Sequence, residues 1–374
     1  MLVGGLHDIG NGDALSVGSN QDKDWMSDGA SAHSDDDDDG ADGDDGARAA
    51  TLPTGQVVSI DEQAMDGEEA KDADGEGAKD EDGEEAKDAD GDTLTIDHSE
   101  LVERLDFELV PFTAHCPPPL TQAEMLFVSA ITTGHPPGAI VRHRNKARID
   151  VAVADVLLLG GDSWLNDQVL NSVIALLNFE DERAASSLLG SFASEGAGGE
   201  PRRRPRTRTM NTYFFTRLHS RLIGYVYQNV SSWGRVYGVD LNVVDVILIP
   251  VHVHRTHWAL LKIDVEHRLF VYFDSLPGGV VDEPIDVARR WLYDELCAQL
   301  GVDIADKWGV FSWPVGHNDE DPEQEDGGSC GVFVLAAAHC YAAGLPLTFS
   351  QADIPALRCR RAIALFFDDL GGSS

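Results

Sequence analysis

The chain has 374 residues and a formal net charge of −37, a length that fits one large domain with a tail or two ordinary domains. Residues 1–100 hold 31 Asp and Glu against 5 Lys and Arg, a net of −26, so the remaining residues carry only −11. A polyanion of this kind repels phosphates, which argues against nucleic acid as the main partner.

The cysteines and the apolar runs restrict where the protein can work. There are five cysteines with no CxxC pair, no basic-then-apolar leader opens the chain, and the longest apolar runs are short. These features favour free thiols in a reducing compartment and exclude a membrane-spanning segment. We therefore expect a soluble protein of the nucleus or the cytoplasm that is not secreted.

Residues 1–110 are predicted to form a disordered acidic tail, because they hold too few large apolar residues to offset the chain entropy of folding. A calcium site in the Asp-x-Asp-Gly steps is a weaker alternative. In a loop starting at Asp72, Gly83 stands where calcium loops need a bidentate Glu. The tail contains an aspartate run and an octad repeated three times: Asp35–Asp39, Glu68–Gly75, Glu76–Gly83 and Glu84–Gly91.

Residues 111–374 are predicted to form one domain. Thr121 can cap a helix over Gln122–Thr132, which ends at Gly134 before two prolines. Extended segments follow around 139–141 and 149–153. A second helix is expected after Asp167, because apolar residues recur there with helical spacing; they are Leu165, Val169, Leu170, Val173, Ile174 and Leu177.

Residues 190–209 break this pattern and are predicted to be a surface loop inserted in the domain. Gly, Ser and Ala come first, followed by Pro201–Arg208 with five arginines. The arginines could be a nuclear-import signal or a contact for an acidic partner. The plainer alternative is a solvated loop that folds back on the acidic tail.

The second half of the domain alternates strands and helices. Val243–Val253 is a nearly continuous apolar run, typical of a central strand buried on both faces. Helices on both sides of a short cluster of strands indicate an α+β domain. The further strands are expected at 257–264 and 267–274, and the helices at Thr212–Leu222, Pro284–Leu300, Gly331–Ala343 and Leu357–Leu370.

Cys330 is the best candidate for a reactive group. It ends the glycine-bearing loop 324–331, and an apolar helical run follows at once. A helix N-terminus favours thiolate over thiol, because its free N–H groups carry partial positive charge. Taken alone, such a cysteine is more often a small buried hydrophobe.

A base and its orienting carboxylate are predicted on the two strands upstream. If the hairpin is symmetric about Val265 and Glu266, His257 and Asp274 face each other across the ladder, within hydrogen-bonding reach. Asp274 would then orient the imidazole, and the other ring nitrogen could take the Cys330 proton. A slip by one residue would place the two side chains on opposite faces.

Gln324 adds a fourth element, since its amide and the backbone N–H of Cys330 could stabilise an oxyanion. A zinc site made of His252, His254 and His257 is an alternative use of the histidines, because alternate strand residues share a face. No cysteine or carboxylate completes that set nearby. No metal and no organic cofactor is therefore expected.

Several motifs in this order together resemble the ubiquitin-like-protein-specific (SUMO) protease family over roughly residues 118–370. The motifs are Trp164–Asp167, Asn211–Phe215, Val246–His252, His257–Trp258, Tyr272–Ser275, Gln324 and Cys330–Gly331. The resemblance implies a papain-like cysteine protease fold with a small mixed central sheet flanked by helices. It also implies cleavage after the Gly-Gly end of a SUMO-type modifier, and we expect the protein to be a monomer.

Carried over to this chain, the resemblance makes His257, Asp274 and Cys330 the triad and Gln324 the oxyanion-hole residue. Trp164 and Trp258 look like the two indoles that clamp the glycine tail of the modifier, and Asp167 looks like the carboxylate that pairs with a modifier arginine. The family usually has Asn and Asp where this chain has Asp326 and Ser329. Negative charge from Glu325 and Asp326 is expected to raise the pKa of Cys330 somewhat.

Three functions remain open at this point. The leading one is processing or deconjugation of SUMO. The second keeps the fold but changes the substrate to NEDD8, ubiquitin or a viral polyprotein. The third is a modifier-binding module with weak or no catalysis, which the complete set of His, Asp, Gln and Cys argues against.

Overall fold

The computed structural model describes residues 117–370 except 143, 187–191, 194–201, 221, 277–281 and 317–319, together with residues 87, 93–96, 102–103 and 115. All of these belong to one compact unit, Glu76–Ser374. The aspartate run, the first two octads and most of the predicted tail lie outside the described residues, so the disordered tail stays a prediction.

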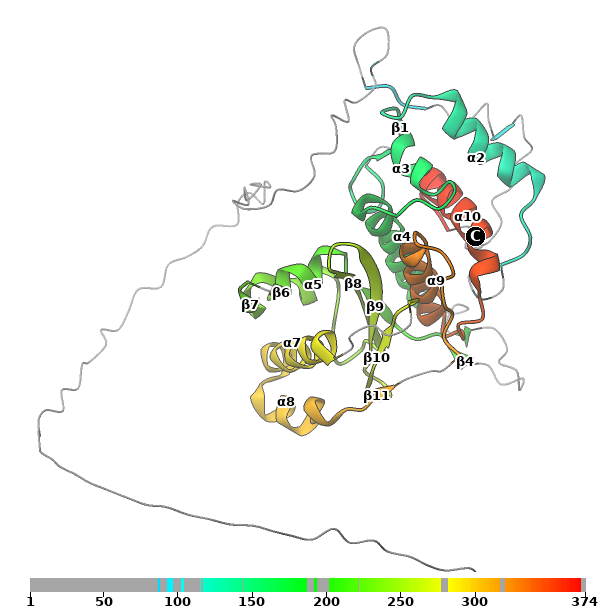
Figure 1. Ribbon diagram of the computed structural model, residues 1–374. Helices are drawn as coiled ribbons and strands as arrows, with labels where there is room; N and C mark the ends of the chain where they lie inside the picture. Colours follow the sequence, from blue (N-terminus) through cyan, green and yellow to red (C-terminus); the bar gives the residue numbers. More distant parts are fainter. Residues whose placement is uncertain are drawn as a thin grey trace, which may run out of the picture. The chain divides into compact units, whose positions relative to one another are not determined.

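A five-stranded mixed sheet forms the centre of the unit, in the order β11-β10-β9-β8-β5 (Figure 1). The three middle strands, β8 (Val246–Val253), β9 (His257–Asp264) and β10 (Leu269–Phe273), are antiparallel. The edge strands β5 (Thr207–Thr209) and β11 (Val315–Gly316) run parallel to their neighbours. The predicted small mixed sheet is confirmed.

Both faces of this sheet are buried, which explains the unbroken apolar run of β8. Val246 and Leu248 join one core and Ile247 and Ile249 the other, because successive side chains of a strand point to opposite faces. The first core is closed by α2 (Gln122–Gly134), α4 (Asp167–Ser186), α9 (Cys330–Ala343) and α10 (Ile354–Phe367), and the second by α5 (Tyr213–Leu218) and α7 (Asp282–Leu300).

The smaller elements connect these layers. They are β1 (Ile140–Arg142), β2 (Val151–Ala152), α3 (Val153–Leu158), β3 (Phe192–Ala193), β4 (Arg202–Arg203), β6 (His219–Ser220), β7 (Gly224–Tyr225), η1 (Tyr227–Val230), α6 (Trp233–Val236), α8 (Val302–Trp308), η2 (Val310–Ser312) and η3 (Gln351–Asp353).

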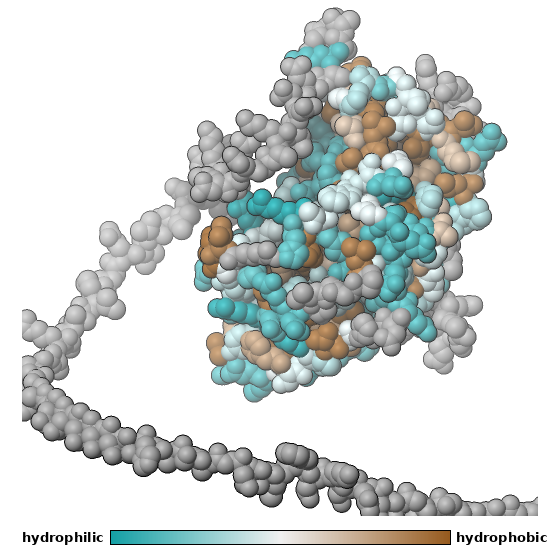
Figure 2. Space-filling view, in the orientation of Figure 1, coloured by the Kyte–Doolittle hydropathy of each residue, from teal (hydrophilic) through white to brown (hydrophobic). Residues whose placement is uncertain are grey.

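In the part of the chain that the structure describes, no helix is long and apolar enough to cross a bilayer. Exposed apolar side chains form separate groups on the face shown in Figure 2. Met125 and Leu126 on α2 are exposed apolar residues.

Most of the predicted helices and strands are confirmed, and the first helix shows why. Thr121 accepts from the backbone N–H of Glu124, and the Glu124 carboxylate accepts from the N–H of Thr121. This reciprocal capping box fixes the start of α2. The helix predicted over Thr212–Leu222 is too long, because α5 ends at Leu218 and the chain reverses through β6 and β7.

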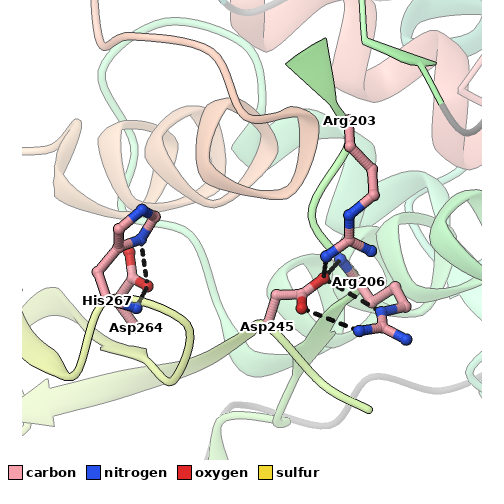
Figure 3. A network of polar contacts seen from close by, with 5 residues as sticks. All are labelled: Arg203, Arg206, Asp245, Asp264 and His267. Atoms are coloured by element: carbon pink, nitrogen blue, oxygen red, sulfur yellow. Dashed lines mark hydrogen bonds and ion pairs between the residues drawn. The ribbon is translucent and has the colours of Figure 1, made fainter.

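The prediction of a loop over 190–209 is wrong at its C-terminal end, where Thr207–Thr209 form β5. The arginines before this strand bind carboxylates of the fold. Arg203 and Arg206 both hold Asp245 at the start of β8, at 2.7 and 3.1 Å (Figure 3). Arg204 donates to the buried Asp181 of α4. These contacts join the segment before β5 to the domain, although the Arg203 and Arg206 side chains stay 46% and 42% exposed.

The same end of the sheet is fixed at the β9–β10 turn. Asp264 accepts from the backbone N–H of His267 and lies 2.9 Å from its Nδ1 (Figure 3). The backbone N–H groups of Val265 and Glu266 donate to the Asp245 carbonyl. The turn, the start of β8 and the arginine segment are therefore bonded to one another at one end of the sheet. His257 lies at the opposite end of β9.

Residues 94–96 correct the N-terminal boundary of the ordered domain. Ile96 is buried in the first core, and its N–H donates to the Ile140 carbonyl. These residues lie within the stretch predicted to be disordered. They are ordered because Leu94 and Ile96 supply apolar area that the acidic repeats before them lack.

Candidate active site

His257 and Asp274 are brought together by the hairpin, as predicted. His257 begins β9, Asp274 follows the last residue of β10, and Nε2 lies 2.6 Å from Oδ1. The predicted register is wrong by two residues. Symmetry about Val265 and Glu266 would pair Phe273 with Trp258, but Phe273 pairs with Leu260. A shift of two residues keeps both side chains on one face, so the diagonal pair still meets.

Cys330 is the first residue of α9 and is 3% exposed. With Nε2 bound to Asp274, the other nitrogen of His257 remains for Cys330, with which the ring interacts. Burial disfavours the imidazolium, but hydrogen bonds with Asp274 and Cys330 outweigh it and raise the pKa of His257 to about 9. Burial also opposes the thiolate, yet His257 and the backbone N–H of Trp258 hold the pKa of Cys330 below its ordinary value.

The two shifts have opposite directions, and together they favour a thiolate–imidazolium ion pair near neutral pH. The net pKa of Cys330 is lowered, so any increase from the negative charge of Glu325 and Asp326 is outweighed, with His257 the strongest of the causes that lower it. The Asp326 carboxylate is itself bound by donors of its own loop.

We expect the rate of Cys330 alkylation and kcat/KM to follow this ion pair. Both should rise as the thiolate forms at a pH below the ordinary thiol range, and kcat/KM should fall as His257 loses its proton near pH 9. Iodoacetamide labelling of the Cys330 peptide against pH measures the first limb. An alkylation midpoint at or above the value of a free cysteine would contradict the ion pair.

Gln324 is buried beside this pair and its amide is fixed at both ends. Nε2 donates to the Asp326 carbonyl at 2.7 Å, and Oε1 accepts from the Ser275 hydroxyl at 2.7 Å. A carbonyl oxygen can only accept, so the amide nitrogen must face Asp326. The second N–H of Nε2 has no partner among the residues that the structure describes, so it can donate to an oxyanion.

Asp326 organises the loop that precedes Cys330. Its carboxylate accepts from the N–H groups of Gly328 and Ser329, from the Ser329 hydroxyl and from the Gln351 amide. Burial opposes the charged form, but these hydrogen bonds prevail and lower the pKa of Asp326. The departures from the family pattern thus form a bonded pair, with Asp326 as acceptor and Ser329 as donor.

The loop lies directly against the segment that carries Trp164. The Trp164 indole donates to the Gly327 carbonyl at 2.6 Å and is 53% exposed. A Cβ built on Gly328 would overlap the Asp162 carbonyl, and one on Gly331 would press on Leu165. Glycine is therefore required at 328 for the two segments to meet.

Gly328→Ala is expected to lower kcat by about 10²-fold, because the added methyl must push the Cys330 loop off the Trp164 segment, and a displacement near 1 Å has effects of this size. Single-turnover rates on the folded enzyme measure the loss. Gly327→Ala is the matched control, since a Cβ there meets nothing within 4 Å. Equal activity in both variants would show that the close approach does not matter.

The chain matches the Ulp1 protease family, C-terminal catalytic domain, over residues 163–368. It belongs to that family. The match includes all seven residues singled out from the sequence, and it makes the chain a cysteine peptidase.

Individual relatives agree with this assignment. Putative ubiquitin-like-specific protease 1B of Arabidopsis thaliana is 32% identical over 68% of this chain and 69% of its own length. Ubiquitin-like-specific protease 1A of the same plant is 30% identical over 65% of this chain, which spans 44% of that relative. The C-terminal Ulp1 protease domain solved in complex with Smt3, the yeast ortholog of SUMO, superposes with a TM-score of 0.52 at 22% identity, over 68% of this chain and 98% of that one.

The predicted substrate-binding residues of this Ulp1-family chain differ in exposure. Trp164 is open to solvent, whereas Trp258 is 4% exposed, stacks on His252 and donates to the Leu165 carbonyl. Asp167 is the half-buried first residue of α4, where a carboxylate also suits the helix dipole. Their roles toward a modifier stay predictions.

The histidine zinc site is not supported. His252 uses its ring face to stack on Trp258 at a centroid distance of 3.9 Å, and His257 is bound to Asp274. Among the described residues, no cluster of three or more His, Cys, Asp or Glu is placed to hold a metal ion. The Asp-x-Asp-Gly octads considered for calcium lie almost entirely outside those residues.

Sequence reasoning missed two residues of the site. Ser275 orients the Gln324 amide through its hydroxyl and accepts the Gln324 backbone N–H on its carbonyl. Arg358 of α10 donates to the backbone of the Cys330 loop. Ser275 could have been found from its place directly after Asp274, whereas nothing in the sequence around Arg358 points to the site.

Proposed function

We propose that this protein cleaves the peptide or isopeptide bond after the C-terminal Gly-Gly of a ubiquitin-like modifier, and that the modifier is SUMO. The arrangement of Cys330, His257 and Asp274 carries the chemical part of this proposal. The names of the relatives support the substrate, as does the exposed Trp164 indole beside the Cys330 loop. An aromatic wall at that point favours a thin glycine tail, because any Cβ would clash with it.

The reaction starts from the ion pair. The Cys330 thiolate attacks the carbonyl carbon of the terminal glycine, a C–S bond forms, and the carbonyl oxygen becomes an oxyanion. The C–N bond then breaks as the His257 imidazolium gives its proton to the leaving lysine amine. Water, deprotonated by His257, attacks the resulting thioester and releases the modifier and the thiolate.

The oxyanion has two donors in this scheme: the free N–H of Gln324 Nε2 and the backbone N–H of Cys330. Ser275 and the Asp326 carbonyl hold the Gln324 amide in advance, so little reorganisation is needed when charge develops. Cys330 begins α9, and its own N–H is one of the unpaired donors at that helix end.

A panel of SUMO, NEDD8 and ubiquitin bearing a C-terminal vinyl-sulfone-type electrophile tests the proposal. The SUMO probe should label Cys330 fastest, and the Cys330→Ser variant should give no adduct. Labelling of Cys330 by the ubiquitin or NEDD8 probe alone would keep the enzyme and replace the substrate. Failure of all three probes, together with an unreactive Cys330, would leave the modifier-binding module as the better reading.

We also propose that the protein is located in the nucleus or the cytoplasm. A reactive thiolate needs reducing surroundings, and the described cysteines are all free thiols.

We further propose that the acidic N-terminal region has a regulatory role and takes no direct part in catalysis. Deletion of residues 1–90 should spare cleavage of a minimal SUMO substrate, since Leu94 and Ile96, which pack in the first core, are retained. Loss of that cleavage would show that the tail serves catalysis directly.

A further inference from the structure

Arg358 is an unusual buried cation next to the active site. It lies on α10 and is 3% exposed, and its four hydrogen bonds in the described part of the chain all go to carbonyl or hydroxyl oxygens. Burial of a guanidinium costs free energy unless its donors are satisfied. A protein that keeps a buried guanidinium usually relies on the fixed, planar arrangement of its N–H donors.

The four bonds tie together two segments that are far apart in sequence. One terminal nitrogen donates to the carbonyls of Leu158 and Ser163, both at 3.0 Å. The other donates to the Gly328 carbonyl at 3.1 Å and to the Ser329 hydroxyl at 3.2 Å. The first pair leads directly into Trp164, and the second pair directly precedes Cys330.

Charge in this region is balanced across the same bridge. Burial lowers the pKa of Arg358, and the charges of Asp326, Asp162 and Cys330 act against that effect. Asp326 binds the same two loop residues, Gly328 and Ser329, as the guanidinium does. The loop before Cys330 is therefore held by a carboxylate and a cation of opposite charge.

We propose that Arg358 is a positioning residue that sets the Trp164 segment and the Cys330 loop at their working separation. The planar fork is suited to this task, because it fixes the directions of all four bonds at once. A lysine keeps the charge but is a single flexible point donor, so it cannot hold both segments. The inference concerns the thiol and the loop, and it rests on the proposed function only where modifier turnover is measured.

The test compares Arg358→Lys with Arg360→Lys. Arg360 lies on the same helix, is also buried (6% exposed), and also makes four hydrogen bonds, but to Glu124, Pro118 and Pro119 and not to the loop. Arg358→Lys should lower kcat about 10²-fold, the effect of a displacement near 1 Å. It should also move the alkylation midpoint of Cys330 upward, because the thiolate is no longer aligned with the helix N-terminus and His257.

Arg360→Lys should unfold at a lower temperature but keep the wild-type kcat per folded molecule and the wild-type alkylation midpoint. Ser329→Ala, which removes one of the four bonds together with the bond from the Ser329 hydroxyl to Asp326, should give an intermediate loss of about tenfold. Alkylation of Cys330 requires no modifier, so it tests the positioning role of Arg358 even if SUMO is not the substrate. A wild-type alkylation midpoint in Arg358→Lys and Ser329→Ala, or equal kcat losses in Arg358→Lys and Arg360→Lys, would overturn the proposal.

Discussion

Cys330→Ser is expected to lower kcat/KM for a SUMO precursor by about 10⁶-fold, the scale seen when a nucleophile acting within a triad is removed. The reason is specific to this site. A serine hydroxyl does not ionise near neutral pH, so the ion pair with His257 that lowers the pKa of Cys330 cannot form. Steady-state cleavage of a fluorogenic SUMO precursor measures the loss.

Cys297→Ser is the matched control, because Cys297 is a half-buried free thiol of α7, an element of the second core. This variant should keep full activity. Cys330→Ser should retain affinity for the modifier, since Trp164 and the loop are unchanged. Significant residual turnover in Cys330→Ser, or its loss in Cys297→Ser, would mean that a different thiol does the chemistry.

The triad could be predicted from the sequence because its members lie on regular elements or directly beside them. Strand alternation and the hairpin were enough to bring His257 and Asp274 to one face, even though the predicted register was wrong by two residues. Side-chain facing depends only on the parity of the register, so an even error leaves it intact. The exact diagonal geometry depends on the β9–β10 turn, which is fixed from within by the Asp264 carboxylate and from outside the hairpin by the Asp245 carbonyl.

The pairing of the arginines within the fold could not be predicted, for the opposite reason. Arg203 and Arg204 bind the buried Asp245 and Asp181, which lie far from them in sequence, although the Arg203 side chain stays 46% exposed. Arg358 was missed in the same way, since its acceptors are three backbone carbonyls and the Ser329 hydroxyl, about 30 and 200 residues away. Such contacts leave no local pattern to read.

Asp274 has the second largest expected effect, and two substitutions separate its two tasks. Asp274→Ala removes both the orientation of the His257 ring and the charge that raises the pKa of His257. Loss of the carboxylate of a triad has effects near 10⁴-fold, so kcat should fall by about that factor. The same cleavage assay and a pH profile measure both consequences.

Asp274→Asn should do less harm, because Oδ1 of Asp274 also accepts the backbone N–H of Leu276 at 2.9 Å. That donor keeps a carbonyl oxygen, rather than the amide nitrogen, toward Nε2 of His257, so the ring keeps its orientation. The charge is gone, and the pKa of His257 should fall from about 9. The alkaline limb of kcat/KM then moves to lower pH, since the imidazolium needed to protonate the leaving amine is lost earlier. An unchanged alkaline limb in Asp274→Asn, or equal losses in the Asn and Ala variants, would show that orientation and charge are not separable here.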